Sequence, residues 1–194
     1  MDTISVLGQG KMGSPMALQL LKAGYRVSVY NRTRAKCRPA VQAGAVEAGS
    51  IGELVAGSDA LLLMIGWDSD VHEVVLGAGG VLEAGHAGLL VIDSTTIHPL
   101  TSQRMAAAAA QKEIDYLDAP VMSNSEDARR GRLWFQVGGS EAAYRRALPL
   151  FEAMGDRHVY LGRSGAGSGA KCGSFPARWW GKRGYIADPD VSYA

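Results

Sequence analysis

Short apolar segments alternate with helix-forming segments along most of the chain. This alternation is typical of a parallel sheet whose strands are joined by helices, so we predict an α/β fold with a doubly wound, mostly parallel sheet and helices on both faces. The expected strands are Thr3–Leu7, Arg26–Tyr30, Ala45–Ala48, Ala60–Ile65, Leu89–Asp93, Tyr116–Ala119, Leu133–Val137 and His158–Leu161.

Four helices are expected from apolar spacing and from residues that start or stop a helix. Met12–Ala23 carries an apolar residue at every fourth position, which gives one stripe that packs on a sheet. Ser50 and Glu53 match a capping box and open a short helix to Val55. The alanine-rich 100–112 stretch and the 141–154 stretch, which glycine closes, are helical by propensity.

A glycine cluster lies between the first expected strand and the first expected helix. A dinucleotide pyrophosphate needs backbone N–H groups at a helix N-terminus, and glycines where a Cβ would block the turn, the ligand or the helix packing. This strand-to-helix context predicts a Rossmann-type domain over residues 1–163. The expected cofactor-binding residues of the loop are Gly8, Gln9, Gly10, Lys11, Met12 and Gly13.

The end of the second strand lies beside the adenosine ribose in such a domain and selects between NAD and NADP. This chain has Asn31, Arg32 and Thr33 there, with no acidic residue to hold the ribose hydroxyls. A guanidinium pairs well with a phosphate, and a threonine can donate to it. We therefore predict that NADP is the cofactor and that NAD is less favoured. The alternative is that Arg32 is only a solvated charge on a loop.

The extended motif that begins at Gly8 resembles the β-hydroxyacid dehydrogenase family, which includes 3-hydroxyisobutyrate dehydrogenase and tartronate semialdehyde reductase. Three later segments are also similar to that family. Asp93–Pro99 resembles its loop beside the nicotinamide, Asp118–Val121 the start of its substrate loop, and Gly165–Lys171 its catalytic-lysine segment. The resemblance covers the chain from its first residue to about Cys172.

The resemblance implies hydride transfer between a nicotinamide and the carbinol carbon of a small hydroxyacid substrate. It implies that Lys171, in the interdomain segment 164–172, is the general acid or base, a task that suits an ammonium whose pKa is brought toward neutrality. By the same matching, Thr96 contacts the nicotinamide or the substrate, and Met64 and Ile65 line the cofactor. His98 receives no catalytic role.

The substrate loop departs from the family pattern. The family continues with Ser-Gly-Gly, whereas this chain has Met122, Ser123 and Asn124. A methionine cannot donate a hydrogen bond, so Ser123 and Asn124 are the expected substrate-binding residues. Imine reductases, which resemble the family in their N-terminal domain, also depart from the pattern, so reduction of a C=N bond is an alternative function.

The tail after Lys171 is the larger departure. The family continues with a long helix into a second helical domain and has an asparagine where this chain has Phe175; Pro176 alone would cost a helix interior about 3 kcal/mol. We expect residues 173–194 to be irregular, from an out-of-frame or truncated gene, with no second domain. A basic aromatic tail that contacts nucleic acid or a partner is the competing interpretation. Without the second domain, turnover and the family's homodimer become doubtful, and a non-catalytic NADP-binding fragment is a third candidate.

Composition excludes several classes of protein. Apolar residues make up 47% of the 194 residues and charged residues 20%, with a net charge of +1, which gives no indication of a nucleic-acid partner. The sequence has neither an apolar run long enough to cross a bilayer nor a signal peptide, so we expect a cytoplasmic protein without a membrane partner. Cys37 and Cys172 are expected as reduced thiols. The histidines show no metal-ligand spacing, and no metal site is predicted.

Overall fold

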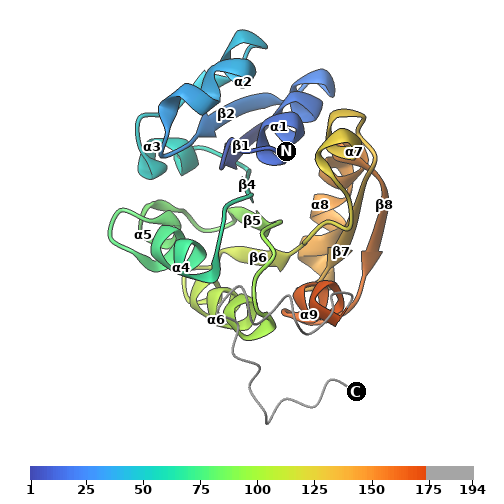
Figure 1. Ribbon diagram of the computed structural model, residues 1–194. Helices are drawn as coiled ribbons and strands as arrows, with labels where there is room; N and C mark the ends of the chain where they lie inside the picture. Colours follow the sequence, from blue (N-terminus) through green and yellow to red (C-terminus); the bar gives the residue numbers. More distant parts are fainter. Residues whose placement is uncertain (174–194) are drawn as a thin grey trace.

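The computed structural model describes residues 1–173, and its centre is one six-stranded sheet (Figure 1). The strands are β1 (Thr3–Leu7), β2 (Arg26–Tyr30), β3 (Val46–Glu47), β4 (Ala60–Leu63), β5 (Leu90–Asp93) and β6 (Asp115–Asp118). They lie in the order β3-β2-β1-β4-β5-β6, and every neighbouring pair is parallel. The order reverses between β1 and β4, which places a ligand crevice at the carboxyl ends of these strands. The doubly wound α/β prediction is confirmed.

Nine α-helices and one short 3₁₀ helix, η1, connect the strands within residues 1–173. Their bounds are α1 (Gly13–Lys22), η1 (Arg34–Cys37), α2 (Arg38–Gln42), α3 (Ile51–Val55), α4 (Asp68–Leu76), α5 (Val81–Ala84), α6 (Pro99–Ala110), α7 (Ser125–Arg129), α8 (Glu141–Met154) and α9 (Ala166–Gly173). The four predicted helices are present. Pattern reading missed the other five, α2, α4, α5, α7 and α9, because each is short, and α9 is rich in glycine, which favours helix poorly.

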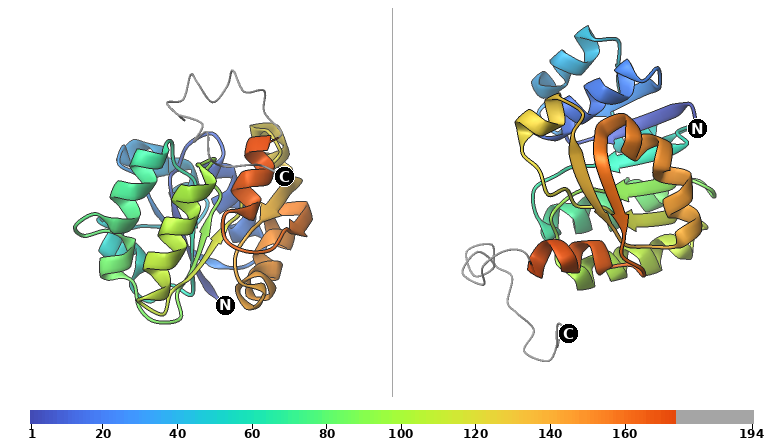
Figure 2. Two further views of the ribbon diagram at one scale, coloured as in Figure 1. Left: turned by 90° about the horizontal axis from the view of Figure 1, so that it is seen from below. Right: turned by 90° about the vertical axis from the view of Figure 1, so that its right-hand side faces the viewer.

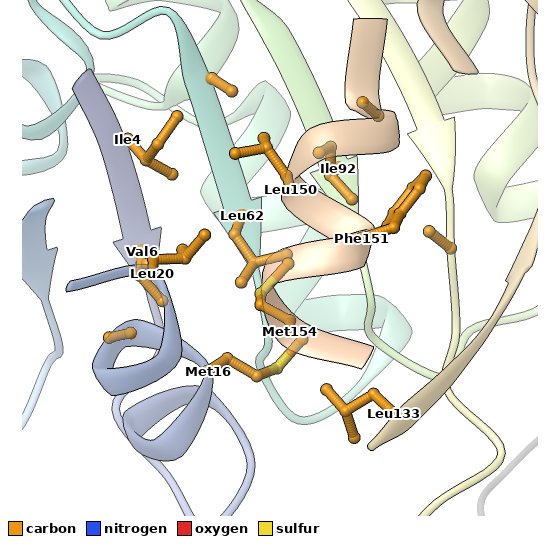
Figure 3. Packing of buried hydrophobic residues seen from close by; sticks show 14 of the residues in the cluster. Ile4, Val6, Met16, Leu20, Leu62, Ile92, Leu133, Leu150, Phe151 and Met154 are labelled. Atoms are coloured by element: carbon orange, nitrogen blue, oxygen red, sulfur yellow. The ribbon is translucent and has the colours of Figure 1, made fainter. Parts of the chain in front are cut away.

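The sheet is buried on both faces because alternate residues of each strand point to opposite sides. Leu62 of β4 joins a core formed with α1, α2, α7 and α8, in which Met16 and Met154 also lie (Figure 3). Leu61 and Leu63 join a second core, which α3, α4, α5 and α6 cover. Helices therefore lie on both faces, as predicted.

Two strands differ from the prediction of a single sheet. β7 (Leu133–Val137) and β8 (Gly155–Tyr160) form a separate parallel pair. Two isolated antiparallel bridges link this pair to the main sheet: one joins Phe135 of β7 to Val121 after β6, and the other joins Asp118 of β6 to Gly138 after β7. β8 begins at Gly155, directly after α8, and not at His158. The predicted start lies three residues too far along the chain, because residues 155–157 are a glycine and two charged residues on an exposed edge and carry no apolar signal. Residues 174–194, where an irregular tail was expected, lie outside the described residues.

Candidate functional site

The three glycines between β1 and α1 each meet a different steric demand. Gly8 has φ +99°, and a Cβ there would lie 2.1 Å from the Met64 carbonyl oxygen. A Cβ on Gly13 would lie 1.8 Å from the Gly8 carbonyl oxygen, whereas one on Gly10 would have no atom within 4 Å. The first and third glycines therefore let backbone segments pack closely, and the second leaves open space on the side where a pyrophosphate approaches.

Hydrogen bonds to β2 fix the glycine loop and leave the start of α1 open. Gly8 N donates to Tyr30 O over 2.9 Å, and Gln9 N donates to Asn31 Oδ1 over 2.9 Å. No side chain of the described residues caps the α1 N-terminus, where Met12 is the N-cap. The free N–H groups of a helix start attract an anion, so the loop fits a dinucleotide pyrophosphate.

A cavity of about 550 Å³ extends from the glycine loop across the ends of β2 and β4. It is lined by Leu7, Gly8, Gly10, Lys11, Met12, Tyr30, Asn31, Arg32, Thr33, Lys36, Ile51, Met64, Ile65, Gly66, Trp67, Asp70, Glu73 and Val74. Nine of the twelve predicted cofactor residues line it; Gln9, Gly13 and Thr96 do not. Gln9 is 3% exposed and lies beneath the loop, donating through Nε2 to Val6 O.

Sequence reasoning missed the α4 side of this cavity. Trp67, Asp70 and Glu73 are spaced three residues apart, which puts them on one face of a helix. The signal was present in that spacing, but a helix of nine residues in a polar segment was not recognised. Lys36, four positions after Arg32, was also missed; it adds a second cation at the end of β2.

A buried carboxylate ends β5 and organises the loop after it. Asp93 is fully buried; its Oδ1 accepts from Thr95 N over 2.8 Å and its Oδ2 from the Tyr116 hydroxyl over 2.6 Å. Burial raises the pKa of Asp93 to about 6, against the lowering effect of these donors. Thr95 Oγ1 in turn accepts from Ile65 N over 3.2 Å, so the loops after β4 and β5 are tied together. Thr96 follows this fixed turn and is partly exposed.

Lys171 lies on α9 and is only 7% exposed. Its Nζ donates to Val121 O over 2.7 Å and contacts Met122 Sδ at 3.2 Å. A thioether is a weak acceptor, so the carbonyl is the stronger of these two contacts. The structure thus brings the lysine to the segment after β6 in which the substrate residues were predicted.

Asp118 attaches the lysine helix to the sheet. Its Oδ1 accepts from Gly165 N and its Oδ2 from Ser168 N, both over 2.7 Å, and the residue is fully buried. Burial raises the pKa of Asp118, while these backbone donors act to lower it. Ser168 also shares a hydrogen bond of 2.8 Å with Ser102, and α9 lies beside α6 (Figure 2). The position of Lys171 therefore depends on β6 and α6.

The two predicted substrate residues already serve the protein's own backbone. Ser123 Oγ accepts from Trp134 N over 3.1 Å, which leaves its hydroxyl hydrogen available to donate. Asn124 is the N-cap of α7, and its Oδ1 accepts from Glu126 N and Asp127 N. Its amide oxygen is committed to that cap, and substrate contact by either residue stays a prediction.

The described residues contain no group of three or more histidine, cysteine or acidic residues that could hold a metal ion. Within the same part of the chain, no helix has both the length and the apolar character to cross a membrane. Cys37 and Cys172 are both buried thiols that are not joined in a disulfide. The candidate site thus has two parts: the glycine loop with its cavity, and the buried Lys171 on α9.

A family model described as the NAD binding domain of 6-phosphogluconate dehydrogenase matches residues 3–162. The chain belongs to this family. The match covers β1 to β8, including the glycine loop and the cavity, and ends just before α9. This NAD-binding domain has relatives that are 3-hydroxyisobutyrate dehydrogenase-like, NAD(P)-dependent oxidoreductases.

Three relatives show how far the likeness extends. An NAD-dependent L-serine dehydrogenase of Pseudomonas aeruginosa is 39% identical over 171 residues, 88% of this chain and 57% of that protein. The structure of Mycobacterium tuberculosis 3-hydroxyisobutyrate dehydrogenase with L-serine is 33% identical, with a TM-score of 0.85 over 89% of this chain and 59% of that one. A reductive aminase of Aspergillus terreus with NADPH and ethyl-5-oxohexanoate is 26% identical, with a TM-score of 0.77 over 89% and 60%. The chain spans less than two thirds of each.

Proposed function

We propose that this domain binds NADP and serves hydride transfer between the nicotinamide and a small hydroxyacid, in an oxidoreductase of the 3-hydroxyisobutyrate dehydrogenase type. The observation that carries the proposal is the cavity at the glycine loop, which joins an uncapped helix start to the end of β2. The membership of the family supports the dinucleotide.

The choice of NADP rests on the charges at the end of β2. Arg32, Thr33 and Lys36 line the cavity there, and no acid of β2 or its following turn does. A 2′-phosphate on the adenosine ribose gives the two cations a partner, whereas NAD presents only neutral hydroxyls. Asn31 uses its amide group to hold the loop, since its Nδ2 also donates to Thr33 O over 3.0 Å.

The chemical step is assigned to Lys171. Bound NADP supplies the hydride acceptor in oxidation and, when reduced, the donor. As the carbinol hydrogen leaves as hydride, the hydroxyl proton passes to the Lys171 amine, and in the reverse direction the ammonium returns it to the carbonyl oxygen. The contact of Nζ with Val121 O holds the group at the substrate segment. The cytoplasmic location stays a prediction, and the family's homodimer stays doubtful for this chain.

One observation favours the reduction of a C=N bond as a second candidate. Met122 Sδ lies 3.2 Å from Lys171 Nζ. An apolar thioether therefore borders the lysine at the position where the β-hydroxyacid dehydrogenase pattern has a serine hydroxyl. Such a border suits a substrate without a carboxylate at that point. The relative that is a reductive aminase supports this candidate.

The cofactor proposal is tested by titrating the protein with NADPH and NADH and following the quenching of tryptophan fluorescence. We expect NADPH to bind more tightly, and tighter binding of NADH would contradict the proposal. Turnover is then measured with 3-hydroxyisobutyrate, tartronate semialdehyde and a cyclic imine. Binding without turnover would support the third candidate, a non-catalytic NADP-binding fragment. Turnover that survives Lys171→Ala unchanged would show that the lysine assignment is wrong.

A further inference from the structure

Opposite charges line opposite sides of the cofactor cavity. Lys11, Arg32 and Lys36 come from the glycine loop and the end of β2, while Asp70 and Glu73 come from α4. The pyrophosphate and the 2′-phosphate of NADP are both anionic, so the basic side suits them and the acidic side would repel them. The α4 side must therefore face a part of the cofactor that is neutral or that donates hydrogen bonds.

The three acids of α4 differ in what their carboxylates do. Asp68 Oδ1 accepts from His98 N over 2.9 Å, and Asp70 Oδ2 accepts from Trp67 N over 3.0 Å. Both carboxylates therefore hold the protein's own backbone. Glu73 is exposed and lines the cavity, and within residues 1–173 its carboxylate makes neither a hydrogen bond nor an ion pair. Among the three acids of α4, only Glu73 has both carboxylate oxygens outside any hydrogen bond or ion pair within residues 1–173.

The rest of the lining on this side is largely apolar. Ile51, Ile65 and Val74 line the same cavity as Glu73, and so does Trp67, the N-cap of α4. With the pyrophosphate at the loop and the ribose at the end of β2, the base is the part of the adenosine half that is left for this region. An apolar lining suits the flat faces of adenine. The edge of the adenine ring presents the N6 amino group as a hydrogen-bond donor.

We infer that Glu73 reads the base of the dinucleotide by accepting a hydrogen bond from the N6 amino group of adenine. This inference rests on the proposed function and adds a specificity-determining residue to it. Hypoxanthine has a carbonyl oxygen, O6, in place of that amino group. Because O6 and the carboxylate are both hydrogen-bond acceptors, no hydrogen bond can form between them. The glutamate therefore selects adenine over hypoxanthine dinucleotides.

The test compares NADPH with its hypoxanthine analogue, nicotinamide hypoxanthine dinucleotide phosphate, by fluorescence titration of the full chain. We expect the wild type to bind NADPH about tenfold more tightly than the analogue, the difference expected for one charge-assisted hydrogen bond. Glu73→Gln keeps the size of the side chain and can donate to O6, so the preference should fall to about twofold. Glu152→Gln, an exposed acid on α8, is the matched control and should keep the wild-type preference.

Each outcome separates the inference from the proposed function. If NADPH binds but the wild type does not discriminate between the two bases, Glu73 does not read adenine. The same conclusion follows if Glu73→Gln retains the full preference. If neither dinucleotide binds, the cofactor proposal itself fails, and the inference fails with it. Thermal unfolding of Glu73→Gln should match that of the wild type, because within residues 1–173 the Glu73 carboxylate makes neither a hydrogen bond nor an ion pair.

Discussion

Two helices of this domain begin in glycine-rich segments, and their N-termini have different occupants. The start of α1, after Gly8 and Gly10, has no side-chain cap among the described residues and opens into the cofactor cavity. The start of α9, after Gly165, accommodates the buried carboxylate of Asp118, which accepts from Gly165 N and Ser168 N. Both satisfy the same physical demand, because the N–H groups and the dipole of a helix start favour an anion.

The difference teaches that a glycine-rich helix start predicts that an anion binds there, but not whether this anion is a ligand or a side chain of the protein itself. In α1 the glycine at position 10 leaves space, since an added Cβ would meet nothing within 4 Å. In α9 the corresponding space is filled, and a Cβ on Gly167 would lie 2.3 Å from Gln136 O and 2.5 Å from Asp118 O. The first helix start leaves room for an anion from outside the protein, and the second is held by Asp118 on the helix that carries Lys171.

The largest effect is expected from removing the carboxylate at α9. Asp118→Ala leaves two buried N–H groups without a partner and should lower the free energy of unfolding by about 3 kcal/mol. Urea denaturation measures this loss, and labelling of Lys171 by an amine reagent should become faster as α9 loosens. Asp156→Ala, in an exposed pair with Arg157, is the control and should change little. A variant as stable as the wild type would mean that Asp118 does not hold α9.

A second test asks whether the anion at α1 includes a 2′-phosphate. Arg32→Ala should weaken NADPH binding about twentyfold, the loss of one charge-assisted contact, and leave NADH binding nearly unchanged. Titration with both dinucleotides measures the ratio. Arg34→Ala is the matched control, because Arg34 pairs with Glu47 over 2.7 Å and does not line the cavity. Equal losses for NADPH and NADH would refute the phosphate contact.

A third change separates the folding role of a glycine from its ligand role. Gly10→Ala adds a methyl group into open space, so the fold should keep its stability within about 0.5 kcal/mol. NADPH affinity should nevertheless fall about tenfold, since the Cβ occupies the path of the pyrophosphate. Gly167→Ala should do the opposite, destabilising α9 through its close contacts. If Gly10→Ala binds NADPH normally, the loop does not contact the pyrophosphate.

The smallest effect concerns the other fully buried acid at a strand end, Asp93. Burial raises its pKa in the folded state to about 6, above the value in the unfolded chain, so the folded state holds the proton more tightly. The free energy of unfolding should therefore fall as pH rises between about 4 and about 6. Lowering the pH from about 7 to about 5 should stabilise the wild type by about 1 kcal/mol more than Asp93→Asn. Parallel curves for the two proteins would contradict this.

Most of the fold followed from local patterns, and the site followed only in part. Leu61–Leu63 and the other strands were predictable because a buried parallel strand is a continuous apolar run. Asn31 and Arg32 were placed correctly at the cavity because the glycine loop fixes where β2 must end. Asn124 shows the limit: its residue type suits a substrate or a helix cap, and only the structure shows that its oxygen caps α7.

The sequence by itself determined the strand-to-helix glycine loop, the alternation that builds the sheet and the basic end of β2, because each depends on neighbouring residues. The tertiary structure decided which helix start is open and which is filled. Asp118 reaches Gly165 and Ser168 across 47 and 50 residues of chain, and Lys171 reaches Val121 across 50. Such partners are brought together by β-sheet packing, and no local pattern records them.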